Sequence, residues 1–261
     1  MDRNFEILEF DKIRKMLQEY AMTDAAKELC IQLTPSLSQT EVSHRQRETT
    51  EARILLDKAG QPPLMSLFGI RESIRAAVQG QCLSAGELEQ LEQMLAGIWR
   101  LKTYLGKTKY LETGLAYYDE NLEELPELRA QIGDAIRNGR VDDKASRYLE
   151  SLRREIQNVD DQIRKKAESV LRTHKAWTAE AYVTIKNGRF CIPVKKEHRS
   201  RLSGTVVTQS ATGSTLFIEP EAVGELTEKL ASLQFEEENE ERRVRYELSA
   251  LAAEHEDAFL K

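Results

Sequence analysis

The chain has 261 residues, of which 31% are charged and 40% hydrophobic, and it contains only 13 Gly and 6 Pro. Average domains carry about 45–50% apolar and about 25% charged residues, so this composition indicates an elongated helical protein with less core than a compact globule. No run of about 18 apolar residues occurs, and the first residues lack the apolar segment of a signal peptide. We therefore expect a cytoplasmic protein with no membrane partner.

The first part of the chain, residues 1–140, is predicted to form a helical core domain. Ser84 stands three residues before Glu87, which predicts a capping box for a helix that begins there. A looser stretch from Asp119 to Asp143, which includes Pro126, places the first domain boundary near residue 140. The apolar residues that recur at helical spacing in this part are Leu8, Ile13, Leu17, Ala26, Leu29, Leu33, Ile54, Leu55, Leu88, Leu91, Leu95 and Ile98.

Two heptad-like segments follow, at residues 141–178 and 221–261. A helix from about Arg147 to Trp177 would be roughly 45 Å long, so it needs a partner along its length. The second segment keeps the same spacing and has no Gly after Glu225, so we expect it to run back as a single helix to Lys261. Its seam is interrupted at Glu236–Glu238, where the helix is either solvated or meets a basic surface. The seam residues are Leu152, Ile156, Val159, Ile163 and Val170 in the first segment and Val223, Leu226, Leu230, Leu233, Val244, Leu248 and Leu251 in the second.

Residues 179–220 carry the one strand-forming pattern. Asn187-Gly188 lies between Tyr182–Lys186 and Arg189–Val194, which predicts a β-hairpin because both turn residues must take positive φ. Pro193 is then expected on a sheet edge, since it cannot donate to a ladder. Two further strands are predicted at Thr205–Gln209 and Thr215–Ile218. The fold class is therefore mainly α, with a helical core bundle, a long antiparallel two-helix lever arm and a small antiparallel β clamp at the arm tip.

Nothing in the sequence predicts a catalytic, cofactor-binding or metal-binding residue in this chain. Gly106-Lys107-Thr108 resembles the end of a phosphate-binding loop, but Leu101 stands where the first Gly is needed and no strand precedes it. The four histidines are scattered, and the acidic residues fall in helical charge runs typical of solvated faces. Cys30, Cys82 and Cys191 form no Cys-x-x-Cys pair and are interpreted as reduced, buried thiols.

A cluster of positive charge distinguishes the β segment. Between Tyr182 and Gln209 six basic residues accompany one acidic residue, whereas Glu219 to Lys261 holds 13 acidic and five basic residues in a chain of net charge −6. This separation is the one expected of a tip that contacts phosphates. The alternative is a solubilising loop over a short hairpin. The candidate phosphate-binding residues are Lys186, Arg189, Lys195, Lys196, Arg199 and Arg201.

Several stretches of the chain together match a known family. They are Val183 to Lys195, His198-Arg199, Gly204, Ser210, Gly213, Phe217 to Pro220 and, in the first part, Leu8 to Ile13, Pro35, Ile70-Arg71, Gly80 and Leu83-Ser84. Through these residues the β segment resembles the clamp of the second type of bacterial MutS paralogue, an endonuclease and ATPase family with an Smr domain. The resemblance covers essentially the whole chain.

The resemblance implies that this chain is the core, lever and clamp of a longer parent, cut before its ATPase and Smr nuclease domains. The parent would use ATP and Mg, act as a homodimer and embrace either branched DNA or ribosomal RNA on collided ribosomes. Its expected roles are suppression of homologous recombination or ribosome rescue. This chain itself would be no enzyme and hold no cofactor.

Two other functions remain open at this point. The arm could be a protein-interaction or dimerisation stalk with no direct nucleic-acid contact. The chain could also be a nuclease by itself, which would require a carboxylate or His cluster that the sequence does not display.

Overall fold

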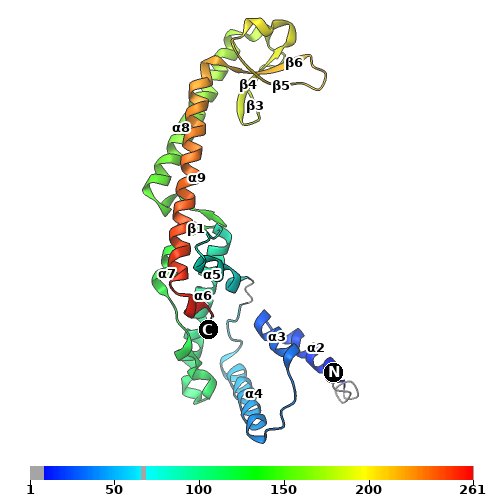
Figure 1. The fold of residues 1–261 in the computed structure, drawn as a ribbon, viewed down its shortest axis with the longest axis vertical. Coiled ribbons are helices and arrows are strands. Elements are labelled where there is room, and N and C mark those ends of the chain that lie inside the picture. Colours follow the sequence, from blue (N-terminus) through cyan, green and yellow to red (C-terminus); the bar gives the residue numbers. More distant parts are fainter. Residues whose placement is uncertain (1–8, 66–68, 261) are drawn as a thin grey trace. The chain divides into compact units, whose positions relative to one another are not determined.

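The structure, a computed structural model, describes residues 9–65 and 69–260 (Figure 1). It is mainly helical, as predicted, with a four-stranded antiparallel sheet and a two-stranded hairpin. Leu8 and Lys261, which two helix predictions included, lie outside the described residues. The chain divides into a core unit, Met1–Asp142 with Arg245–Lys261, and an arm unit, Asp143–Val244. Within the described ranges, every helix is too short or too polar to cross a bilayer.

Only part of the core unit packs around an apolar centre. Its first two described helices, residues 10–20 and 24–32, have no buried residue, and the apolar residues predicted there, Ile13, Leu17 and Leu29, are exposed.

The helices from residue 70 onward form the centre. Ser84 caps the longest of them, and its capping box with Glu87 confirms the predicted helix start. Buried residues at helical spacing, such as Leu88, Leu91 and Leu95, form that centre with Ile132. The elements are α2 (Phe10–Tyr20), α3 (Asp24–Gln32), α4 (Gln39–Ala59), α5 (Ile70–Val78), α6 (Ala85–Thr108), η1 (Lys109–Leu111), η2 (Gly114–Asn121), α7 (Pro126–Ala135), β1 (Ile136–Arg137), β2 (Arg140–Val141) and α10 (Glu256–Leu260).

The stretch from Asp119 to Asp143 is more ordered than the sequence predicted. Pro126 begins α7 at its first turn, where the missing N–H of proline costs nothing. The hairpin of β1 and β2 turns through Asn138 and Gly139, which have φ of 52° and 68°. Pro126 led the sequence analysis to expect irregular structure here, but a proline at the first position of a helix favours the helix.

The expectation of one helix running to Lys261 is wrong. The second long helix, α9 (Gly224–Ala253), ends at Ala253, and α10 follows after a turn in which the His255 N–H donates to Ala252 O at 3.1 Å. The last turns of α9 belong to the core unit. There the Leu83 N–H donates to Ser249 Oγ at 2.9 Å. This bond joins residues far apart in the chain, so no local sequence pattern predicts it.

The arm unit is an antiparallel pair of helices, α8 (Arg147–Thr173) and the first part of α9, with the sheet at one end (Figure 1). The predicted seam is confirmed, because Leu152, Val159 and Ile163 of α8 pack in one cluster with Leu230 and Leu233 of α9. α8 ends at Thr173, four residues before the predicted end, and a 3-10 turn, η4 (Lys175–Trp177), follows.

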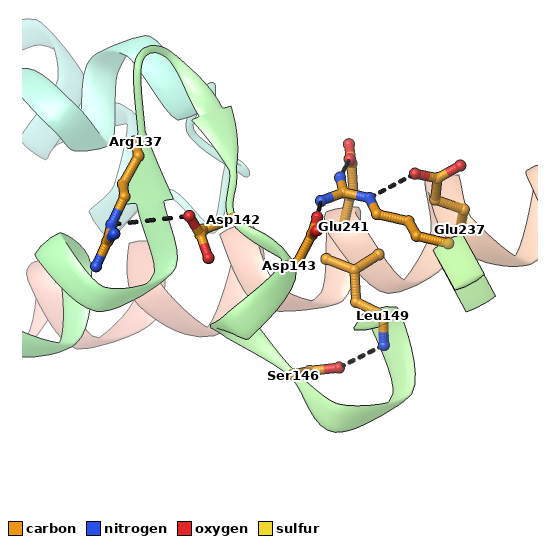
Figure 2. Close-up of polar contacts among 8 residues, drawn as sticks. Arg137, Asp142, Asp143, Ser146, Leu149, Glu237 and Glu241 are labelled. Carbon is orange, nitrogen blue, oxygen red and sulfur yellow. Dashed lines mark hydrogen bonds and ion pairs between the residues drawn. The ribbon is translucent and has the colours of Figure 1, made fainter. Parts of the chain in front are cut away.

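The acidic run of α9 contacts α8 rather than solvent alone. Arg153 Nε donates to Glu237 Oε1 at 2.7 Å, and the same guanidinium binds Asp143 and Glu241. Figure 2 shows the three carboxylates around this one guanidinium. Tyr148 donates to Glu236 at 2.5 Å. Burial acts to lower the pKa of Arg153, but its bonds to Glu237 and Asp143 outweigh that effect and raise the pKa. Of the two expectations for this run, contact with a basic group is the one the structure supports.

A second polar contact lies one turn further along the same seam. Ser146 caps α8 by accepting from the Leu149 N–H at 3.0 Å (Figure 2), and its hydroxyl donates to Glu240 at 2.6 Å. Hydrogen bonds from Arg243 and Ser146 lower the pKa of Glu240 to about 2. We call Arg153, Glu237, Glu241, Ser146 and Glu240 the polar clasp.

The sheet of the arm unit has the strand order β3-β4-β6-β5, and all of its pairs are antiparallel. The predicted hairpin is confirmed, with φ of 50° at Asn187 and 73° at Gly188. Buried side chains from β4 and β6, among them Ile192 and Ile218, pack on Leu171 of α8. The strands are β3 (Thr184–Lys186), β4 (Arg189–Lys195), β5 (Gly204–Gln209) and β6 (Thr215–Pro220), and the 3-10 turns are η3 (Asp143–Ala145), η5 (Lys196–Arg201) and η6 (Glu221–Val223).

The expectation that Pro193 lies on a sheet edge is wrong, because β4 is an interior strand. Pro193 pairs with Phe217 of β6, and its carbonyl accepts from the Ala179 N–H at 2.9 Å. In an antiparallel strand the N and O of one residue point to the same side, so the proline nitrogen also faces Ala179. The β6 ladder therefore loses no hydrogen bond to the proline.

Gly204 is predicted to be indispensable for closing the sheet. Its φ is 156°, and a Cβ there would lie 2.1 Å from the Glu219 carbonyl oxygen. Gly204→Ala should lower the free energy of unfolding by about 2–3 kcal/mol, measured by urea denaturation. Gly224→Ala at the start of α9 is the matched control, since nothing lies within 4 Å of its added Cβ. Equal stability of the two variants would contradict this account.

Arg153 is predicted to stabilise the helix pair. Arg153→Ala leaves three carboxylates close together without their cation, so the free energy of unfolding should fall by roughly 1–3 kcal/mol. Arg154→Ala is the control, because among the described residues Arg154 pairs with Glu150 alone, on the exposed face of α8. A thermal melt of both variants makes the comparison, and an effect of Arg154→Ala as large as that of Arg153→Ala would refute the role of the clasp.

The three cysteines differ in burial. Only Cys191 is buried, whereas Cys30 and Cys82 are half-buried, so the expectation of three buried thiols is wrong for two of them. Burial raises the pKa of the Cys191 thiol to about 11, which leaves almost no thiolate at pH 8. Iodoacetamide at pH 8 should label Cys30 and Cys82 in the native protein and Cys191 only after unfolding, as read by peptide mass spectrometry. Labelling of Cys191 at a similar rate in the native protein would contradict its burial.

Candidate nucleic-acid interface

The six predicted phosphate-binding residues lie at the two ends of strand β4. The Asn187-Gly188 turn brings Lys186 and Arg189 together at one end. Lys195 ends the strand, and Lys196, Arg199 and Arg201 follow in η5. Six strand steps separate Arg189 from Lys195, which is about 20 Å. The structure therefore places these residues in two groups rather than in one cluster.

Three of the six cations are engaged inside the protein. Lys186 Nζ lies 4.8 Å from the centroid of the Phe217 ring. Arg189 donates to Glu219 at 2.6 Å, and this carboxylate is buried, with its side chain 5% exposed. Arg199 donates to the carbonyls of Leu202 and Gly204 at 3.0 and 2.9 Å and so holds the turn between η5 and β5. These bonds tie the three side chains to the sheet and reduce the charge they offer to a ligand.

The other three cations, Lys195, Lys196 and Arg201, are exposed. No ion pair joins them to a carboxylate anywhere in residues 9–65 or 69–260. An open groove of about 670 Å³ lies beside the two lysines and is lined also by Ala179, Glu197, Ser214 and Thr215. Ammonium groups with nearby hydroxyls suit phosphate oxygens. We call Lys195, Lys196 and Arg201 the basic end of the sheet.

The hydroxyls of this groove escaped the sequence analysis. Thr215 lies opposite Lys195 because β4 pairs with β6, and the Lys196 N–H donates to Ser214 O at 3.0 Å. The two segments are 19 residues apart in the chain, so only the sheet register brings them together. The signal available in the sequence is the Ser/Thr-rich connection Ser210–Ser214 between the last two strands.

The residues that the structure describes hold no group of three His, Cys, Asp or Glu side chains arranged to bind a metal ion. Glu219, a buried carboxylate of β6, is bound to Arg189. The geometry of this surface therefore supports binding through charge and hydroxyl groups, without assigning a bond-breaking step to it.

No protein-family model matches the chain. It is 37% identical over 265 residues to the endonuclease MutS2 of Geobacillus sp. (strain WCH70), an alignment that covers 99% of this chain and 34% of the relative. It is 36% identical over 261 residues to endonuclease MutS2 of Symbiobacterium thermophilum, and this alignment covers 99% of this chain and 33% of the relative. It is 38% identical over 257 residues to endonuclease MutS2 of Geobacillus thermodenitrificans, and this alignment covers 96% of this chain and 33% of the relative.

The chain thus spans about a third of the length of these curated relatives. The similarity extends over nearly all of this chain, which includes both the core unit and the arm unit. The predicted resemblance to the second type of bacterial MutS paralogue is confirmed, and the chain is homologous along nearly its whole length to endonuclease MutS2.

Proposed function

We propose that this chain is the clamp and lever module of a MutS2-type protein, in which the sheet of the arm unit contacts nucleic acid through its phosphates. The observation that carries the proposal is the basic end of the sheet, where Lys195, Lys196 and Arg201 are exposed and unpaired within the described chain. Such contacts attract any polyanion and give affinity that does not depend on sequence. Branched DNA and ribosomal RNA are both substrates of this kind.

In this proposal the four segments have separate tasks. Residues 1–140 form the core, 141–178 and 221–261 form the outgoing and returning lever helices, and 179–220 form the clamp. The apolar seam of α8 and α9 holds the lever together, and it includes Phe190 of β4, so the sheet moves with the helices. A displacement imposed on one end of the helix pair would thereby reach the clamp.

The activity that names the relatives is assigned to the parent and not to this module. ATP and Mg would be bound by other parts of the parent. The endonuclease step would also take place in those parts. Homodimerisation of the parent would let two clamps enclose one substrate. The competing proposal is a protein-interaction stalk, in which the arm contacts protein and the basic end only maintains solubility.

The test is a salt series of binding by fluorescence anisotropy, with duplex DNA, four-way-junction DNA and structured ribosomal RNA as probes. The combined substitution Lys195→Ala, Lys196→Ala and Arg201→Ala should weaken binding and reduce the slope of log K against log salt by roughly 2–3, because each phosphate contact contributes about 0.9. Lys186, Arg189 and Arg199 stay unchanged, since their bonds support the sheet.

The matched control removes the same three charges from helix α4. Arg47, Arg53 and Lys58 are exposed there, and no ion pair is found for them among the described residues. Their replacement by Ala should leave the salt slope unchanged. If both triple variants lose the same amount of slope, the loss is explained by the change in net charge of the protein and not by contacts at the basic end. An unchanged slope in the clamp variant would favour the protein-interaction stalk.

A further inference from the structure

A second pocket lies at the other end of β4, between this strand, β3 and the last turns of α8. Its volume is about 380 Å³, which is in the range of small-molecule sites. Its lining residues are Arg164, Glu168, Leu171, Arg172, Ala181, Tyr182, Val183, Ile185 and Phe190. All of them belong to the arm unit.

The apolar part of this pocket is open to solvent. The side chains of Tyr182 and Ile185 are 56% and 55% exposed, although they border a cavity with the buried Phe190 as its inner wall. The Tyr182 hydroxyl is hydrogen-bonded to the Glu180 carboxylate, which raises its pKa and restrains the ring. Exposed aromatic and branched side chains around a concave site offer a stacking surface to a flat ring.

The polar part of the pocket is a row of three charges on α8. Arg164, Glu168 and Arg172 follow at four-residue spacing and therefore share one face of the helix. The Arg164 guanidinium lies 6.0 Å from the Phe190 ring centroid. Within the described chain, none of the three takes part in an ion pair, even though their spacing permits one. Their hydrogen-bonding capacity is thus available to a ligand.

We propose that this pocket takes one unpaired nucleobase of a nucleic acid whose backbone lies on the basic end of the sheet. The central Glu168 carboxylate repels a phosphate but accepts from the exocyclic amino group of a base such as cytosine. The two flanking guanidinia suit the phosphates on either side of that nucleotide. This inference rests on the proposed function and adds to it a substrate class, nucleic acid with an extrahelical or single-stranded base.

The distance between the two sites fits one ligand. Phe190 and Lys195 are five strand steps apart, or about 17 Å. Along a duplex the phosphates of one strand advance about 3.4 Å per base pair, so roughly five base pairs separate a base in the pocket from a phosphate at Lys195. A paired base could not enter the pocket without leaving its helix, whereas a base at a bulge or a junction is already unpaired.

The test compares three DNA duplexes with the same number of base pairs: fully paired, with one bulged cytosine, and with the same bulge lacking its base. Stacking is worth about 1–3 kcal/mol per base, so the bulged cytosine should bind roughly 10-fold more tightly than the abasic bulge. The abasic duplex isolates the base from the bend and flexibility that any bulge introduces. Fluorescence anisotropy at low salt gives the three dissociation constants.

The combined variant Tyr182→Ala and Ile185→Ser should reduce the preference for the bulged cytosine to about one and leave the affinity for the fully paired duplex unchanged. Tyr110→Ala, which removes a tyrosine that is 69% exposed in the core unit, is the matched control and should retain the preference. Circular dichroism of each variant verifies that the fold is intact.

The outcomes separate this inference from the function on which it rests. Salt-dependent binding with equal affinity for the cytosine and abasic bulges overturns the base pocket and leaves the clamp proposal standing. A preference that persists in the Tyr182→Ala and Ile185→Ser variant also overturns it, because the base is then held elsewhere. Absence of binding to every probe at low salt overturns both.

Discussion

The apolar seam between α8 and α9 holds the two helices of the arm unit together. Leu152, Val159 and Ile163 lie against Leu230 and Leu233, and the same cluster continues into the sheet through Phe190. Packing of this kind is close to that of a coiled coil, where each side chain fills a gap in the facing helix. This cluster and a second one, in which Ile192 and Ile218 of the sheet pack on Leu171 of α8, together position the sheet and its candidate ligand groups.

The polar clasp gives this seam a register. Glu237 and Glu240 occupy heptad positions of α9 that would otherwise carry apolar residues, since they continue the spacing from Leu230 and Leu233. Arg153 and Ser146 of α8 satisfy them. A sliding of one helix by a turn would separate these groups and leave buried or half-buried carboxylates without partners, so polar residues in an apolar seam select one alignment. A pair of helices fixed in this way suits a lever, because it transmits displacement without slipping.

The basic residues of the sheet segment fall into two groups that the sequence does not distinguish. Arg189 and Arg199 bind groups of the sheet itself, and Lys186 covers an aromatic ring. In the proposed clamp, Lys195, Lys196 and Arg201 are the cations that contact the nucleic acid. The basic end of the sheet offers charge and hydroxyl groups, whereas the pocket beside Tyr182 combines charge with an apolar wall. Together they would permit a clamp to hold the backbone of many sequences and still prefer a distorted or branched structure.

The sequence by itself determined the features that depend on neighbours along the chain. The capping box at Ser84, the Asn187-Gly188 hairpin and the seam of α8 were predicted correctly, because each is defined within a few residues or by the helical repeat. The tertiary structure decided the rest: the interior place of Pro193, the end of α9 at Ala253, and which cations are bound internally. These depend on strand register and on contacts between distant segments, and the free energy of such contacts is set by partners that no local pattern identifies.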